Sequence, residues 1–185
     1  KALELKANVL RHLDRKQEAI EAYRAAVDVQ PGNAELRLSL ARLLVETGQV
    51  ADAREQFEVL AEQSPENPDV IYALGLLAME AGDFDAAEES LRQLVKSGRY
   101  VNEAAYALGQ IAQQQGHSGE AMRWYGAVTQ GENYLDAKIS IALILAEEEG
   151  LAEARSYLQG LQPDNDAEHI RLYLAEGELL REHGQ

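Results

Sequence analysis

Residues 40–65 read LARLLVETGQVADAREQFEVLAEQSP, and this stretch decides the fold of the chain. Gly48 separates two runs whose apolar residues recur at the spacing of an amphipathic helix. Glycine tolerates the left-handed backbone that ends many helices, and Pro65 cannot continue the second helix. The stretch therefore predicts a helix, a tight turn, a second helix and a stop.

The same unit recurs along the chain with a period of 34 residues. The glycines at this spacing are Gly48, Gly82, Gly116, Gly150 and Gly184. In the second helices the series is Ala19, Ala53, Ala87 and Ala121, and Ala154 follows after 33 residues. A third series, in the first helices, is Ala7, Ala41, Gly75, Gly109 and Ala142. Small residues at a fixed separation indicate that the two helices of each pair pack closely, around Phe57, Leu91, Tyr125 and Leu158.

The apolar periodicity predicts helices at about 2–14, 16–29, 34–46, 50–63, 68–81, 84–97, 102–115, 118–129, 134–148, 151–160 and 166–182. We expect an all-α, right-handed superhelical solenoid of antiparallel helix pairs. The repeats would span about 1–33, 34–67, 68–101, 102–134 and 135–165, with a half repeat at 166–185. The last helix has no partner, so we expect the array to continue beyond this sequence. Leu172, Leu179 and Leu180 would then face a missing neighbour and give a non-physiological dimer through the cut ends.

Composition narrows the function. The chain has 17 Lys and Arg against 32 Asp and Glu, a formal charge of −15, which argues against a nucleic-acid partner. It has no cysteine, so a disulfide framework and a thiolate metal site are excluded. The apolar stretch 139–146 is far shorter than the roughly 18 residues of a membrane span. The sequence starts at Lys1, so we expect any signal peptide or lipid anchor to lie outside it.

Catalytic and metal-binding patterns are not found in the sequence. The four histidines, His12, His117, His169 and His183, are scattered without the spacing of metal ligands. No glycine-rich phosphate loop and no nucleophile beside a base is recognisable. We therefore predict a protein that is not an enzyme and uses no cofactor and no metal. Trp124 is expected to pack against the following repeat, and an exposed Trp124 would instead be an interface anchor.

The pattern of large, small and aromatic residues resembles the tetratricopeptide repeat (TPR) family. The second repeat carries it most fully, through Leu40, Ala41, Leu44, Gly48, Ala53, Phe57 and Pro65. The third and fourth repeats carry it through Leu74, Gly75, Gly82, Phe84 and Ala87, and through Leu108, Gly109, Gly116, Ala121 and Tyr125. The resemblance departs at Lys6, Glu176 and Arg99. It implies an array that binds protein or an extended peptide in a concave groove lined by the first helices.

The phase of the first helices then names the groove residues. They are Leu38, Arg42, Tyr72, Leu76, Met79, Tyr106, Gln110, Gln113, Ile139 and Leu143. This apolar and aromatic set favours an extended, partly hydrophobic polypeptide, with Arg42 and Gln110 meeting its backbone carbonyls. The family's carboxylate clamp is disfavoured because Glu4 stands where a clamp lysine is expected. The alternative is that curvature of the array buries these side chains against one another.

A second resemblance covers Tyr106 to Leu158, which is similar to TPR lipoproteins of the gram-negative outer membrane. Among these is the adaptor that brings substrates to a periplasmic carboxy-terminal processing protease. This resemblance implies a bacterial periplasmic protein, associated with the outer membrane through a segment not present here, with a protease partner. Three classes stay open: an adaptor or scaffold, a holdase-like chaperone or envelope assembly factor that binds unfolded chains, and an enzyme.

Overall fold

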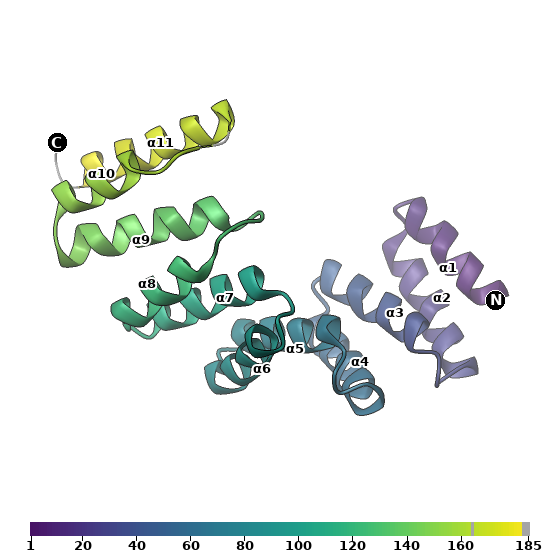
Figure 1. Cartoon of the computed structure of the whole chain (residues 1–185). Helices are drawn as coiled ribbons and strands as arrows, with labels where there is room; N and C mark the ends of the chain where they lie inside the picture. The colour runs from purple at the N-terminus through teal and green to yellow at the C-terminus, as the bar shows by residue number, and fades with distance from the viewer. Residues whose placement is uncertain (164, 183–185) are drawn as a thin grey trace. The chain divides into compact units, whose positions relative to one another are not determined.

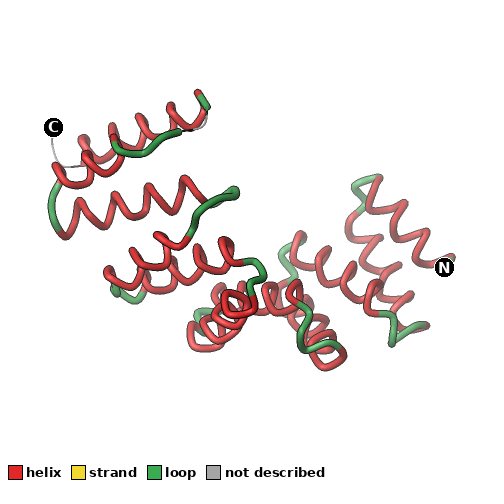
Figure 2. Tube along the Cα trace, in the orientation of Figure 1, coloured by secondary structure: helices red, strands yellow, loops and turns green. Residues whose placement is uncertain are grey.

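The computed structural model describes residues 1–163 and 165–182, which form eleven helices and, as Figure 2 shows, no strand. The helices, labelled in Figure 1, are Ala2–His12 (α1), Lys16–Val29 (α2), Ala34–Glu46 (α3), Val50–Gln63 (α4), Pro68–Glu80 (α5), Phe84–Ser97 (α6), Val101–Gln114 (α7), Ser118–Ala127 (α8), Tyr134–Glu148 (α9), Leu151–Gln159 (α10) and Asp166–Glu182 (α11). Each predicted helix is present with ends within two residues of the prediction. His183 and Gly184, which the sequence analysis singled out, lie outside the described residues.

The chain divides into two compact units, Lys1–Ser90 and Leu91–Gln185, with the boundary inside α6. In the first unit α1 packs on α2, α2 on α3, α3 on α4 and α4 on α5. In the second unit α7 packs on α8, α8 on α9 and α9 on α10, and α11 packs against both α9 and α10. Each unit is therefore a row of helices in which contacts join neighbours in the sequence. The single uninterrupted array stays a prediction.

The tight turns within the pairs form as the glycine spacing predicts. Gly48, Gly82 and Gly116 have φ between 73° and 76°, in the left-handed region. At the first of these turns, the Gln49 amide donates to the Leu44 carbonyl at 2.8 Å and so satisfies one carbonyl at the end of α3. The left-handed residue therefore closes one helix and directs the chain into the next.

The linkers between pairs use side-chain caps. The Asn33 side chain accepts a hydrogen bond from the Leu36 amide and starts α3. The Asn67 side chain accepts one from the Asp69 amide, and Pro68 occupies the first position of α5, where no backbone donor is needed. The preceding second helices, α2 and α4, end two residues before Pro31 and Pro65.

The cores lie between the helices at the predicted register. The side chains expected inside successive repeats are only slightly exposed: Phe57 2%, Leu91 0%, Tyr125 1% and Leu158 3%. The series of alanines in the second helices is fully buried beside them. The repeat register derived from the sequence is thus confirmed.

The prediction for the final helix is wrong in its details. Leu172 and Leu179 do not face a missing neighbour, because they are 9% and 2% exposed and pack with α9 and α10. Leu180 is half-buried. The apolar side chains that α11 does expose are instead Ile170, Tyr173 and Leu174.

Candidate polypeptide-binding surface

In the first unit, the predicted groove residues lie on α3 and α5. Leu38, Tyr72, Leu76 and Met79 are half-buried, whereas Arg42 is exposed. Leu38 also packs against the core shared by α3, α4 and α5, so part of its surface is already covered. This face is therefore apolar but not fully open.

Arg42 has a partner that the sequence analysis missed. Its Nη2 atom lies 2.9 Å from Oδ2 of Asp69, so an ion pair joins α3 to α5. The two side chains are 59% and 36% exposed, and an ion pair in such a position contributes little to stability. The guanidinium can therefore exchange Asp69 for a carbonyl of a bound chain at small cost.

In the second unit, the predicted residues lie on α7 and α9, which contact each other. Tyr106 is half-buried, and its ring centroid is 5.7 Å from that of Tyr125 in α8. Ile139 packs against the core of α9, α10 and α11, whereas Leu143 is 36% exposed. Gln110 is half-buried and Gln113 is exposed. Apolar and amide side chains are thus brought together on one pair of helices.

Buried tyrosines of the second helices hold amide side chains of the first helices. The Tyr125 hydroxyl donates to Oε1 of Gln113 at 2.8 Å, and the Tyr23 hydroxyl donates to Oδ1 of Asn8 at 2.5 Å. Burial raises the pKa of Tyr125 to about 12, so its hydroxyl stays a donor at neutral pH. Phe57 stands at the equivalent position in the second repeat and has no hydroxyl to offer.

An ion pair also crosses the first helices of the second unit. Arg171 of α11 pairs with Asp136 of α9. Burial raises the pKa of Tyr106, Asp136 raises it further, and Arg171 opposes this effect. Tyr106 therefore presents a neutral ring and hydroxyl beside a compensated pair of charges.

The ion pairs follow a spacing that sequence reasoning missed. Arginine precedes its acidic partner by 27 or 28 residues in three pairs, which are Arg24 with Asp52, Arg42 with Asp69 and Arg92 with Glu120. This separation is somewhat less than one repeat, so it joins equivalent helices of neighbouring repeats. A search for opposite charges at this distance could have found these pairs.

Trp124 lies on a second helix and does not line the predicted groove. It packs with the cluster that includes residues of α9, as expected, but it also contacts the preceding second helix. The Arg92 guanidinium lies 5.1 Å from the Trp124 ring centroid, and the indole Nε1 donates to Oε1 of Glu120 at 3.2 Å. The side chain is half-buried and engaged on both sides.

Within residues 1–163 and 165–182, no group of three or more histidine and carboxylate side chains is placed to hold a metal ion. In the same part of the chain no helix is long and apolar enough to span a membrane. The surface formed by Tyr106, Gln110, Gln113 and Leu143 offers apolar contact and amide hydrogen bonds, which suit recognition of a polypeptide.

Comparison with protein families gives a clear result. The tetratricopeptide repeat profile matches residues 4–68 and 72–134, which is more than half of the chain. This chain belongs to the tetratricopeptide repeat family. Members of the TPR family are typically non-catalytic interaction modules, which supports a protein-protein interaction scaffold. Among curated proteins, none matches the sequence significantly.

Solved TPR proteins share the fold. A crystal structure of MamA is 20% identical with a TM-score of 0.76, and the match covers 93% of this chain and 96% of MamA. YrrB, described as a TPR protein with an unusual peptide-binding site, is 21% identical with a TM-score of 0.72, covering 99% and 91%. PilW, described as a widely conserved type IV pilus biogenesis factor, is 19% identical with a TM-score of 0.67, covering 92% and 81%. At these identities the likeness shows the fold alone.

Proposed function

We propose that this TPR protein is a non-catalytic scaffold that binds an extended polypeptide on the first-helix face of its second unit. The observation that carries the proposal is the combination of Leu143, 36% exposed, with the Gln113 amide that Tyr125 holds in place. Leu38, Arg42, Tyr72, Leu76 and Met79 form the corresponding face of the first unit. The same fold carries an unusual peptide-binding site in YrrB.

The chemistry of this face suits an extended chain. Such a chain needs donors for its backbone carbonyls and apolar contacts for alternate side chains. The Gln113 oxygen accepts from Tyr125, so its amide nitrogen is the group left to donate. Gln110 lies three residues earlier on the same helix and offers a second amide. Tyr106 and Leu143 supply the apolar surface.

Charge defines the polypeptide further. The chain carries a formal charge of −15, which repels acidic partners and attracts basic ones over distances longer than a hydrogen bond. On the proposed face itself, Asp136 is paired with Arg171. We therefore expect a peptide that is apolar where it contacts Tyr106 and Leu143, with basic residues at its flanks.

The test uses peptides selected from a random displayed library against the 185-residue chain, with affinity measured by fluorescence anisotropy. Leu143→Glu and Gln113→Ala should each weaken binding by about tenfold or more, which corresponds to about 1.4 kcal/mol. Val29→Glu is the matched control, because Val29 is 69% exposed at the end of α2, a second helix. Tyr106→Ala is unsuitable, since it also removes packing against Tyr125.

The outcomes separate the rival functions. Selected peptides whose affinity is unchanged by both groove variants would overturn the proposed site. Equal binding of any permanently unfolded protein, whatever its sequence, would favour the holdase-like chaperone or envelope assembly factor instead. Loss of binding in Val29→Glu would place the contact on the second helices.

Delivery of protein substrates to a periplasmic carboxy-terminal processing protease is a narrower proposal. It rests on the resemblance of Tyr106 to Leu158 to outer-membrane TPR lipoproteins, and so does the proposed periplasmic location. Cell fractionation with a tagged gene, followed by crosslinking in the envelope, tests both. A tagged protein found in another compartment would overturn them and leave the peptide-binding proposal untouched.

A further inference from the structure

The outer side of α1 carries an apolar stripe. Ala7 and Leu10 face the core and are 0% and 6% exposed. On the opposite side Leu5, Val9 and Leu13 are 65%, 50% and 61% exposed. Their spacing of four residues places them one above another on the same face. The first unit therefore ends in an uncovered hydrophobic surface, which we call the α1 face.

The outer side of α11 carries a second apolar surface. Its inner side is buried through Leu172 and Leu179. On the outer side Ile170, Tyr173 and Leu174 are 59%, 68% and 63% exposed. These three residues define the α11 face. Exposed apolar side chains gathered in this way mark an interaction surface more often than isolated ones do.

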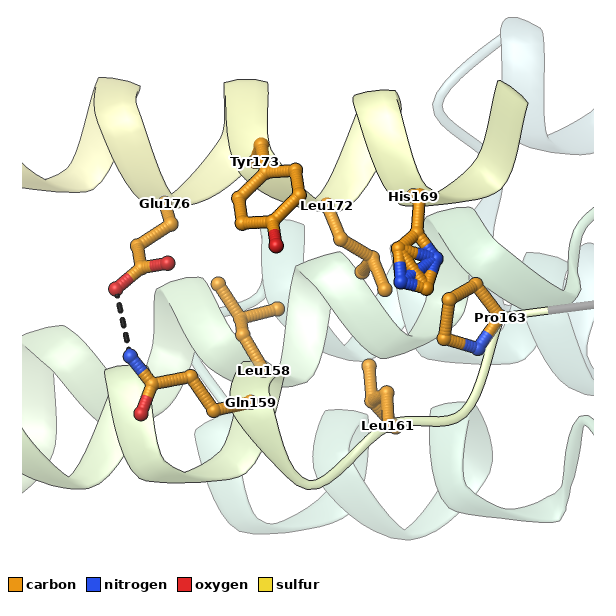
Figure 3. Close-up of a pocket in the computed structure, with 8 residues that line it drawn as sticks. All are labelled: Leu158, Gln159, Leu161, Pro163, His169, Leu172, Tyr173 and Glu176. Carbon is orange, nitrogen blue, oxygen red and sulfur yellow. Dashed lines mark hydrogen bonds between the residues drawn. The ribbon is translucent and has the colours of Figure 1, made fainter. Parts of the chain in front are cut away.

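A pocket borders the α11 face at Tyr173. Figure 3 shows it between the end of α10, the segment after it and α11, with a volume of about 160 Å³. Its lining is Leu158, Gln159, Leu161, Pro163, His169, Leu172, Tyr173 and Glu176. A cavity of about 150 Å³ with apolar walls accepts a molecule the size of benzene, so this pocket has room for one large apolar side chain.

The polar group at the edge of the pocket is already satisfied. Oε1 of Glu176 accepts hydrogen bonds from Arg155 Nε at 2.7 Å and from Gln159 Nε2 at 2.9 Å, the second of which is drawn in Figure 3. An incoming side chain therefore does not have to supply a partner for this carboxylate. The pocket suits a leucine better than a polar residue.

We propose that copies of this chain associate head to tail, with the α1 face of one copy packed on the α11 face of the next. A leucine of the α1 face enters the pocket beside Tyr173. This interaction surface is separate from the proposed polypeptide site and does not depend on it.

Charge selects this pairing over the symmetric ones. Copies with a formal charge of −15 repel each other, so association requires a locally basic surface. Lys6 and Arg11 outnumber Glu4 on α1. The charged residues of α11 within the described side chains are Asp166, Glu168, Arg171, Glu176, Glu178 and Arg181, an acidic balance. Contact between α1 and α11 brings opposite balances together, whereas α1 with α1 or α11 with α11 brings like charges together.

A contact between two different faces leaves one free face of each kind on every dimer. Such a heterologous interface continues into a ring if the rotation closes, or into a filament if it does not. Association should therefore proceed beyond a dimer as the concentration rises. It should weaken with salt, because the ion pairs at its margin are screened.

The experiment measures mass by light scattering on the 185-residue chain from micromolar to millimolar concentration. Val9→Glu blocks the α1 face and Leu174→Glu blocks the α11 face, and each variant alone should be a monomer. An equimolar mixture should form a dimer and nothing larger, since each variant keeps the one face that the other has lost. Val29→Glu, exposed on α2, should associate as the unaltered chain does. Circular dichroism checks that all variants keep their helix content.

Three results would overturn the proposal. The unaltered chain could stay monomeric at every concentration. Val9→Glu could still dimerise while Leu174→Glu does not, which is the pattern of an α11 to α11 contact. The mixture of the two variants could remain monomeric although both are folded.

Discussion

Gly109 of α7 lies directly against the ring of Tyr125 in α8. A Cβ atom at Gly109 would stand 2.6 Å from both Cδ1 and Cε1 of that ring, which is closer than carbon atoms approach without something shifting. The series of small residues in the first helices thus has a physical cause in this repeat. The first helix must yield its side chain so that the aromatic residue of the second helix can enter the core.

Gly109→Ala should lower the free energy of unfolding by about 1–3 kcal/mol, the usual cost of overpacking a core. The change opposes helix propensity, which favours alanine over glycine by about 1 kcal/mol. Urea denaturation followed by circular dichroism measures the difference. Gly126→Ala is the control in α8, because a Cβ there meets nothing within 4 Å. Equal effects of the two substitutions would show that the Tyr125 contact is not limiting.

Repetition explains why so much of the fold could be predicted from the sequence. Each element is printed several times at one period, so Gly48, Gly82 and Gly116 locate turns that a single glycine would leave ambiguous. The last helix was harder, because it has no later copy to set its phase. Its buried side follows Leu172, Ala175 and Leu179, which the period alone did not single out.

The candidate site was only partly predictable. Helix phase places Tyr106 and Leu143 on adjacent first helices, and the structure agrees with this placement. Partners are decided by side-chain geometry across repeats, which periodicity does not contain. The hydrogen bond from Tyr125 to Gln113 and the ion pair between Arg42 and Asp69 therefore became visible only in the structure.

Asp14 takes the place of the turn glycine in the first repeat, 34 residues before Gly48, and adopts φ of 56°. Aspartate tolerates this region better than most residues, but a side chain there still costs free energy that glycine does not incur. Asp14→Gly should therefore stabilise the protein by about 0.5 kcal/mol, and Gly48→Asp should destabilise it by a similar amount or more. The Asp14 contact with Lys16, 3.7 Å long and 86% exposed on the Asp14 side, adds little.

Thermal unfolding of the two turn variants, recorded under the same conditions, checks this prediction. Asp14→Ala serves as the control, since it removes the carboxylate without adding conformational freedom. If Asp14→Ala stabilises the protein as much as Asp14→Gly does, charge and not backbone conformation is responsible.

Arg92 covers the ring of Trp124 and binds Glu120, so three side chains form one cluster between α6 and α8. Arg92→Ala should cost about 0.5–1 kcal/mol, the range of a partly exposed cation–π contact. Trp124 is the one tryptophan of the chain, so its fluorescence reports on this cluster directly. Loss of Arg92 should shift the emission to longer wavelength as the ring gains water contact.

Arg54→Ala is the control for Arg92→Ala, because Arg54 makes a 2.9 Å ion pair with Glu58 on the exposed side of α4. It should leave both stability and Trp124 emission almost unchanged. An unchanged emission in Arg92→Ala would mean that the guanidinium does not shield the ring.

Tyr125 should make the protein sensitive to alkaline pH. Burial raises its pKa to about 12 in the folded chain, whereas an unfolded tyrosine has a pKa of about 10. The folded state therefore favours the neutral phenol, and the resulting stability is fully present below about pH 10 and is lost as the pH rises toward about 12. Within that window the loss approaches about 1.4 kcal/mol per pH unit. Tyr125→Phe has no proton to lose, so its stability should fall less steeply than that of the unaltered protein. Burial also raises the pKa of Tyr106 and of Tyr157, and both groups remain in the variant, so the difference between the two slopes isolates Tyr125. Urea midpoints measured at several pH values across the window give both slopes, and parallel slopes would mean that Tyr125 ionises as readily in the folded protein as in the unfolded chain.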